Sequence, residues 1–268
     1  MDNLDYIKGS LTDFVDALQA GGRYTFVRTE AVTSTGLTDS AFEASLWRLK
    51  KRMRVAIPRK GFYVVVPLEY REAGCPPASW FIHDLMQFLG QPYYVGLLSA
   101  AAIHGAAHQQ PMVLQVITDR ATRPLRAGRV KVQFHKSRTV ERIPVMEAQT
   151  ETGFMRVATP EATALDLVHF MEASGQISNV ATVLAELSER MDASVLVGVA
   201  DAYALPDVQR CGYLLEHLGR YDLTNTLHQR LKKYRYRRVA LVPGKGTELA
   251  ATDARWRIIL NERVEADL

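Results

Sequence analysis

The segment from Arg23 to Pro67 reads RYTFVRTEAVTSTGLTDSAFEASLWRLKKRMRVAIPRKGFYVVVP and decides how the rest of the chain is interpreted. It predicts a short helix around Thr29–Val32, a turn at Gly36, a longer helix after Thr38, and a hairpin up to Pro67. Gly36 suits the turn because glycine adopts positive φ at little cost. Thr38 is a typical N-cap residue, so the longer helix should start immediately after it.

The longer helix shows clear amphipathic spacing. Phe42, Leu46, Leu49 and Met53 follow one another at intervals of four, three and four, which predicts an inward-facing apolar stripe. The opposite face carries Ser40, Ala44, Trp47 and Lys51, with Arg48 beside it. Small and polar residues therefore come near the helix start, and long cations come near its end. A helix, turn, helix and hairpin in this order are typical of a winged helix-turn-helix.

Basic residues concentrate at the end of this helix and in the hairpin. Seven of them and no acidic residue occur between Arg48 and Lys60. Arg59 and Lys60 fall where the hairpin must turn, so we expect both cations to project from the tip of a wing. The pattern and the charge together favour DNA binding. The predicted DNA-contacting residues are Ser40, Ala44, Trp47, Arg48, Lys51, Arg52, Arg59 and Lys60.

Two alternatives stay open for this segment. It could be a solvated helix end followed by an ordinary surface hairpin, and winged domains also serve as protein–protein modules. Asp39 and Glu43 lie near the presumed reading helix, where their negative charges would repel phosphates. The orientation of the helix is therefore open at the level of sequence.

The composition bounds the class of protein. The chain has 268 residues, of which 47% are hydrophobic and 23% charged, as in ordinary soluble globular proteins. Its net charge of +4 is mildly basic, so only the clustering of the cations is informative. The two cysteines form no disulfide framework or metal-binding spacing, which makes a cytoplasmic location the default. Neither a signal peptide nor a membrane-spanning apolar run is recognisable.

The remaining pattern predicts an α+β chain of two domains. A helix from Leu4 to Ala20 should complete a winged helix-turn-helix domain over residues 1–70. The Pro- and Gly-containing stretch 71–79 is the predicted linker, and 80–268 should form a larger mixed α/β domain. In that domain we expect helices over 80–89, 96–107, 177–191, 193–203, 206–218 and 223–234, and a further helix that starts at Pro160 with Thr159 as its N-cap. The expected strands are 112–118, 129–135, 154–158, 238–242 and 255–260. A turn at 243–246 should join the last two strands.

The motifs for catalysis or metal binding are weak. His104 and His108 stand four apart without a recognisable third ligand, which favours a packing role. Gly244-Lys245-Gly246 lacks the full phosphate-loop pattern and predicts a hairpin turn. Asp166 and His169 stand three apart on an apolar helix and are interpreted as a helix charge and a surface histidine. Because no Asp-x-Lys or Glu-x-Lys tripeptide occurs, the commonest metal-dependent nuclease pattern is absent. We expect no enzyme activity, no cofactor and no metal.

A second basic block lies near the C-terminus and is interleaved with Tyr234 and Tyr236. It could neutralise phosphates as an auxiliary nucleic-acid contact. It could equally be the basic end of a helix that complements the helix dipole. The residues in question are Lys232, Lys233, Arg235 and Arg237.

Several stretches together resemble one family. They are Gly61-Phe62-Tyr63 in the wing, the run from Pro92 to Ala102, the stretch His104–Met112, the run from Thr159 to Leu167, and the stretch Gln209–Leu215, with Trp256 and Asn261 near the end. In length and order these blocks resemble the AbiE-type antitoxins of type IV toxin–antitoxin pairs, which act in abortive phage infection.

The resemblance implies a division of labour. The N-terminal domain would bind double-stranded DNA at inverted repeats in its own promoter and repress transcription. The C-terminal domain would be needed to neutralise a nucleotidyltransferase toxin encoded alongside, and the protein itself would not be an enzyme. The alternative is a protein-interaction module that binds the toxin directly without binding DNA.

Overall fold

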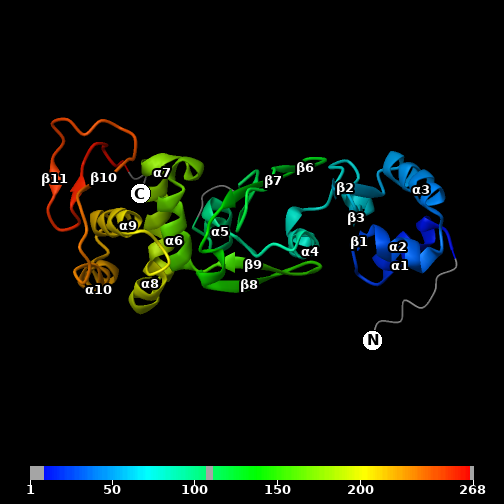
Figure 1. Ribbon diagram of the computed structural model, residues 1–268, viewed down its shortest axis with the longest axis horizontal. Helices are drawn as coiled ribbons and strands as arrows, with labels where there is room; N and C mark the ends of the chain where they lie inside the picture. Colours follow the sequence, from blue (N-terminus) through cyan, green and yellow to red (C-terminus); the bar gives the residue numbers. More distant parts are fainter. Residues whose placement is uncertain (1–8, 107–110, 266–268) are drawn as a thin grey trace.

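The computed structural model describes residues 9–106 and 111–265. The molecule is elongated, with the N-terminal helices at one end and the last helices and strands at the other (Figure 1). A six-stranded sheet lies between the two ends. The mixed α+β character predicted from the sequence is confirmed, including an N-terminal unit of helices with a small antiparallel sheet.

The N-terminal unit has the element order expected of a winged helix-turn-helix. Ser10 forms a capping box with Asp13 and starts the first helix at Leu11, later than predicted from the apolar stripe; Leu4 and Ile7 lie outside the described residues. Gly36 ends the second helix with a φ of 67°, as predicted for the turn. The elements are α1 (Leu11–Ala20), β1 (Thr25–Val27), α2 (Arg28–Thr35), α3 (Asp39–Lys51), β2 (Val55–Arg59) and β3 (Phe62–Val65), with strand order β1-β3-β2.

An aromatic core holds this unit together. The Phe26 ring contacts the Phe14 ring edge-on at 5.5 Å and stacks on Tyr63 at 5.0 Å, and Tyr63 contacts Phe42 at 5.8 Å between ring centroids. The predicted burial of Phe42, Leu46 and Leu49 is confirmed. The prediction for Met53 was wrong: its side chain is 55% exposed. Because α3 ends at Lys51 and Met53 has a φ of 52°, the helical spacing no longer applies there.

The central sheet has the strand order β6-β7-β5-β4-β9-β8. Predicted strands are found at β5 (Leu114–Thr118), β7 (Val130–Lys136) and β9 (Gly153–Ala158). Three others were missed: β4 (Tyr93–Val95), β6 (Leu125–Ala127) and β8 (Val145–Thr150). β4 and β6 are too short for a periodic pattern, and β8 is an edge strand without alternating burial.

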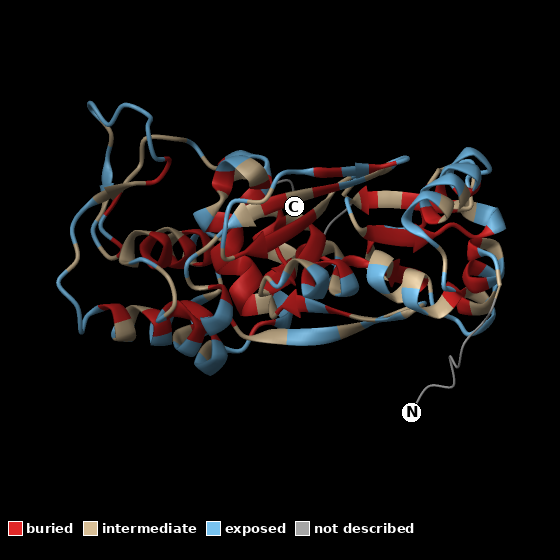
Figure 2. Ribbon diagram, turned by 45° about the vertical axis from the view of Figure 1, so that its right-hand side comes forward, coloured by how far each residue is buried: buried red, intermediate tan, exposed pale blue. Residues whose placement is uncertain are grey.

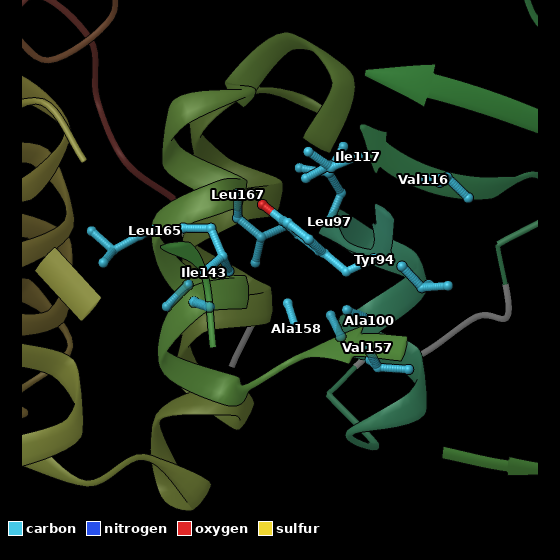
Figure 3. Packing of buried hydrophobic residues seen from close by; sticks show 14 of the residues in the cluster. Tyr94, Leu97, Ala100, Val116, Ile117, Ile143, Val157, Ala158, Leu165 and Leu167 are labelled. Atoms are coloured by element: carbon cyan, nitrogen blue, oxygen red, sulfur yellow. The ribbon is translucent and has the colours of Figure 1, made fainter. Parts of the chain in front are cut away.

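Helices cover the sheet and extend beyond it. The predicted start of α6 (Pro160–His169) is confirmed, because the Thr159 hydroxyl accepts a hydrogen bond from the backbone N–H of Ala162. Around α6, Tyr94, Leu97 and Leu165 belong to a continuous apolar cluster (Figure 3). The other helices are α4 (Ile82–Leu89), α5 (Leu97–Ile103), α7 (Gln176–Leu187), α8 (Ala193–Ala200), α9 (Leu205–His217) and α10 (Tyr221–Leu231).

The C-terminal strands differ from the prediction. β10 (Val239–Ala240) pairs in parallel with β12 (Ile258–Ile259), and β11 (Thr252–Asp253) pairs antiparallel with β12. The glycine-rich turn at 243–246 therefore does not close a hairpin between the two predicted strands, because a hairpin would make them antiparallel. The fully buried Trp256 lies just before β12 and fixes this segment on the helices.

The predicted linker is packed rather than extended. Arg129 donates its backbone N–H to the carbonyl of Ala73, and Cys75 and Ala78 are buried in the large apolar cluster. Ala78, within the predicted linker, begins a short 3-10 helix (Ala78–Trp80). The domain boundaries at residues 70 and 80 stay predictions.

Candidate nucleic-acid interface

The outward face of α3 carries most of the predicted DNA-contacting residues. Ser40, Ala44, Arg48, Lys51 and the following Arg52 are all exposed. Figure 2 shows this helix largely exposed at the end of the molecule, while the strands behind it are buried. A surface that presents cations and small residues on one helix can approach a DNA groove without rearrangement.

Trp47 is the unusual member of this face, because its large apolar side chain is 61% exposed. The Lys51 ammonium lies 5.1 Å from the centroid of the Trp47 ring, a cation–π contact that covers one part of the indole. Arg48 donates to the Ser45 hydroxyl at 3.0 Å. The two cations are thus held close to the helix surface.

The acidic residues at the start of α3 are paired. The guanidinium of Arg28, at the start of α2, lies 3.1 Å from a carboxylate oxygen of Asp39 and also forms an ion pair with Glu43. These contacts raise the pKa of Arg28. The repulsion of phosphates expected from Asp39 and Glu43 is therefore reduced, because an opposite charge accompanies both carboxylates.

The wing differs from the sequence prediction. Lys60 is exposed at the turn, as expected. Arg59 does not project: its guanidinium donates to the backbone carbonyls of Arg123 and Pro124 and lies 5.9 Å from the Phe134 ring centroid. Burial and the nearby charge of Arg123 lower its pKa. The prediction of two free wing-tip cations was thus wrong for Arg59.

Further contacts fix the winged unit on the central sheet unit. Phe62 contacts Phe88 of α4 at 5.5 Å, and a Cβ added to Gly61 would lie 3.4 Å from the same ring. The Tyr24 and Trp80 rings meet at 4.9 Å. One side of the wing is therefore covered by the rest of the chain, and α3 is the accessible element.

Edge strand β6 lies beside β2 and adds cations that the sequence analysis had not assigned to an interface. Arg126 pairs directly opposite Lys131 in the β6–β7 ladder, and both side chains are exposed. Among residues 9–106 and 111–265, neither has an ion-pair partner. Like charges directly opposite one another destabilise a sheet, so an external anion would relieve this arrangement. In the sequence the signal was the spacing of basic residues between Arg120 and Arg129.

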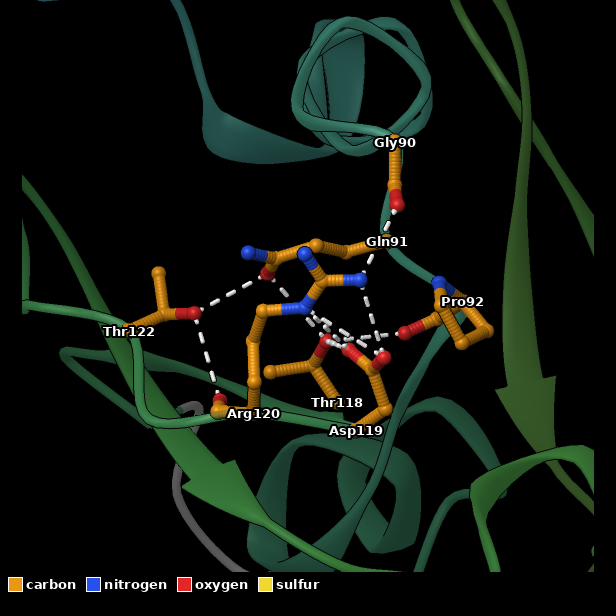
Figure 4. A network of polar contacts seen from close by, with 7 residues as sticks. All are labelled: Gly90, Gln91, Pro92, Thr118, Asp119, Arg120 and Thr122. Atoms are coloured by element: carbon orange, nitrogen blue, oxygen red, sulfur yellow. Dashed lines mark hydrogen bonds and ion pairs between the residues drawn. The ribbon is translucent and has the colours of Figure 1, made fainter.

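Arg120, at the start of this basic stretch, is engaged within the protein. It is paired with Asp119 at 3.1 Å and donates to the carbonyl of Gly90 at 3.5 Å (Figure 4). Thr118 and Thr122 hydrogen-bond to Gln91 in the same network. This network anchors the segment before β6, but it leaves Arg120 unsuited to phosphate contact.

The second basic block lies at the opposite end of the molecule from α3 (Figure 1). Arg230 is paired with Asp201 at 2.6 Å and lies over the Tyr234 ring. The four predicted auxiliary contacts remain exposed: Lys232, Lys233, Arg235 and Arg237. The structure thus separates this block from the α3 surface.

Other predicted sites resolve into structural roles. His104 is buried, with Nε2 2.7 Å from the carbonyl oxygen of Ala158, which confirms a packing role; His108 lies outside the described residues. Burial raises the pKa of the Cys75 and Cys211 thiols to about 12, so both are poor nucleophiles at neutral pH.

In the described part of the chain, no group of three or more His, Cys, Asp or Glu residues could hold a metal. No described helix is long and apolar enough to cross a membrane.

The interpretation of Asp166 as an ordinary helix charge was wrong, whereas His169 is a surface histidine as predicted, with a side chain that is 44% exposed. The Asp166 carboxylate is buried and accepts hydrogen bonds from the hydroxyls of Tyr94 at 3.3 Å and Tyr203 at 2.8 Å. His169 Nδ1 lies 2.7 Å from an oxygen of Asp207. The partners are 37, 38 and 72 residues away, so no local spacing could reveal them.

Residues 94–217 match the family model described as the AbiEi antitoxin C-terminal domain. Over this segment the chain is similar to the AbiEi antitoxin family. The matched residues include Tyr94, Asp166 and α9, and they confirm the resemblance noted in the sequence.

The fold has a counterpart among solved structures. The crystal structure of the RV2827C protein from Mycobacterium tuberculosis superposes with a TM-score of 0.64 and 15% sequence identity, over 92% of this chain and 90% of that chain. At this identity the likeness concerns the fold alone. A search among curated proteins finds no match.

Proposed function

We propose that this protein is a DNA-binding autorepressor and the antitoxin of a type IV abortive-infection pair, acting in the cytoplasm against a nucleotidyltransferase toxin. The similarity to the AbiEi antitoxin family supports the antitoxin role and, with it, a cognate toxin as functional partner. The observation that carries the DNA-binding role is the outward face of α3, where Arg48, Lys51 and Arg52 are exposed. Inverted repeats in its own promoter are the proposed target.

In this proposal α3 enters the major groove, and Lys60 with the β6–β7 edge contacts the flanking phosphates. Figure 1 places α3, β2 and β6 along the same side of the molecule, which supports a continuous DNA track. Phosphate contacts of this kind position a protein on DNA, whereas residues near the helix start select bases. Ser40 and Ala44 therefore carry the proposed base readout, and the cations carry the affinity.

The test is a promoter-fragment shift with the full chain. The wild-type protein should bind its own promoter with an affinity that falls steeply as salt rises. The variant Arg48→Glu with Lys51→Glu should lose the shift while its thermal unfolding stays unchanged. The matched control reverses two cations at the other end of the molecule, Lys232→Glu with Lys233→Glu. It should retain at least one tenth of the wild-type affinity for the promoter. Undiminished binding by the α3 variant would contradict the proposal.

A protein-docking role for the same face is the alternative, and one observation favours it. Trp47 and Met53 are large, apolar and 61% and 55% exposed, as is common for residues at protein–protein interfaces. In that case Trp47→Ala would abolish co-purification with the toxin, and the promoter fragment would not shift. If Trp47→Ala instead abolished the shift of the promoter fragment and retained toxin neutralisation, DNA binding by this face would be favoured.

A further inference from the structure

A cavity of about 300 Å³ lies where the loop after β7, the end of α6 and the connection between α8 and α9 meet. It is separate from the α3 surface and lies in the family-matched segment. Its size is at the lower end of pockets that bind small molecules. Its polar lining residues are 136–139 of the loop after β7, together with Asp166, His169 and Tyr203. The exposed side chains of Lys136, Arg138 and His169 lie at its mouth, and the buried Asp166 lies at its base.

His169 is held in one orientation at this cavity. Its Nδ1 lies 2.7 Å from Asp207, whose second oxygen is 3.1 Å from the Arg210 guanidinium. The hydrogen bond with Asp207 raises the pKa of His169 and favours the imidazolium form. The other ring nitrogen has no hydrogen-bond partner in the described part of the chain, so it is available to a ligand.

Two more cations converge on the mouth. Lys136 and Arg138 are exposed, and neither forms an ion pair with any described residue. Between them, the Ser137 hydroxyl lies 3.0 Å from that of Thr139, and the Ser137 backbone N–H is bonded to the carbonyl of Thr118. The loop is thus anchored to the sheet and presents cations and hydroxyl groups together.

Asp166 lies at the base of the cavity, buried, and its carboxyl group is only half satisfied. One oxygen accepts from the Tyr94 and Tyr203 hydroxyls, and the other is buried without a hydrogen-bond partner among the described residues. Burial raises the pKa of this carboxyl to about 7, so a substantial fraction is neutral at physiological pH. The group then does not cancel the surrounding cations, and its protonated form can donate a hydrogen bond.

We propose that this cavity binds a small phosphorylated metabolite, with the phosphate held by Lys136, Arg138 and His169. Charge-assisted hydrogen bonds to phosphate are the strongest that these side chains can form. Because the mouth has three positive groups and Asp207 is already paired with Arg210, a negatively charged ligand is favoured over a cation or a neutral molecule.

The experiment titrates the full-length protein with ribose 5-phosphate and, separately, with inorganic phosphate, and follows the imidazole resonances of His169 by NMR. Ribose 5-phosphate should shift the His169 signals with a dissociation constant of about 1 mM or tighter. Lys136→Gln with Arg138→Gln should weaken binding at least tenfold, whereas the control Lys232→Gln with Lys233→Gln should leave it unchanged.

Two outcomes would overturn the proposal. The first is the absence of any His169 shift up to about 10 mM of either probe. The second is equal weakening by the mouth variant and the control variant, which would indicate non-specific charge attraction. If the mouth variant fails to fold, as judged by thermal unfolding, His169→Gln replaces it, and calorimetric binding of ribose 5-phosphate must then fall at least tenfold. Promoter binding by the mouth variant and by His169→Gln is measured in parallel and should be unaffected.

Discussion

Arg59, the last residue of β2 in the winged unit, donates a hydrogen bond to the backbone carbonyl of Arg123, 64 residues later and just before β6. A cation expected at the tip of a DNA-binding wing thus joins two parts of the chain. Its guanidinium also lies over the Phe134 ring. Because these contacts attach the winged unit to the central sheet, α3 and the β6–β7 edge keep a fixed position relative to each other.

The pair Arg59 and Lys60 therefore offers a test of two different roles at adjacent positions. Arg59→Gln should lower the free energy of unfolding by about 1 kcal/mol, because it removes charge-assisted hydrogen bonds that are partly screened by solvent. Lys60→Gln should leave stability unchanged but reduce the salt dependence of promoter binding by about one phosphate contact. Chemical denaturation and salt-dependent shifts measure the two effects. If Arg59→Gln instead reduced the salt dependence of promoter binding, and Lys60→Gln lowered the stability, Arg59 would be shown to contact DNA.

Arg28 predicts an indirect effect on DNA affinity. Arg28→Met keeps the aliphatic stem near Phe42 but leaves Asp39 and Glu43 without their partner. We expect promoter affinity to fall several-fold, roughly three- to tenfold, because two uncompensated carboxylates would face the phosphates. Adding Glu43→Gln should restore most of the loss. A double-mutant cycle at constant salt measures the coupling, and additive losses would mean that Arg28 contacts DNA itself.

Asp166 predicts a specific pH dependence of stability. Its folded-state pKa of about 7 is above the usual value of an aspartate, so the native state binds more protons than the unfolded state between about pH 4 and 7. Its contribution is fully present below pH 4 and is lost as the pH rises through 7. Asp166→Asn should therefore stabilise the protein relative to wild type at pH 8, on the order of a few kcal/mol, and much less at pH 4.5.

Denaturant unfolding at the two pH values measures this difference. Glu141→Gln, at an exposed position, serves as the control and should show no such change between the two conditions. A stability difference between Asp166→Asn and wild type that is the same at pH 4.5 and pH 8 would mean that the carboxyl does not titrate in this interval.

The features that could be predicted from the sequence depend on short-range physics. Thr38 and Thr159 cap helices through contacts within three residues, and the spacing of Phe42, Leu46 and Leu49 reports one helix face. These cues identified the winged unit and the start of α6. The same periodicity failed at Met53 because the helix had already ended.

The features that were missed depend on tertiary partners. The three-residue strand β4 is central only because β5 and β9 flank it. Arg59 was predicted to project into solvent because no residue near it in the sequence indicates that the carbonyl of Arg123 would accept its hydrogen bond. Asp166 likewise looks like an ordinary helix charge until Tyr94 and Tyr203 meet it. Side-chain chemistry was therefore predictable where its partners were local and unpredictable where they were remote.

Gly212 predicts how the C-terminal segment is attached. A Cβ at this position in α9 would lie 2.1 Å from the Trp256 ring, and Trp256 is fully buried. The indole N–H also donates to Glu216 at 2.8 Å, so the ring cannot shift freely. Gly212→Ala should therefore destabilise the protein by at least about 2 kcal/mol, although alanine is the better helix former.

The expected readout is a lower unfolding midpoint together with a change in tryptophan fluorescence, since displacement of Trp256 exposes its ring. Gly198→Ala is the matched control, because a Cβ there, on helix α8, meets nothing within 4 Å. That change should be neutral or slightly stabilising through the helix propensity of alanine. Equal stability of the two variants would mean that Trp256 moves away from α9 without cost, and the C-terminal strands would then be attached by the β10–β12 pairing rather than by this ring.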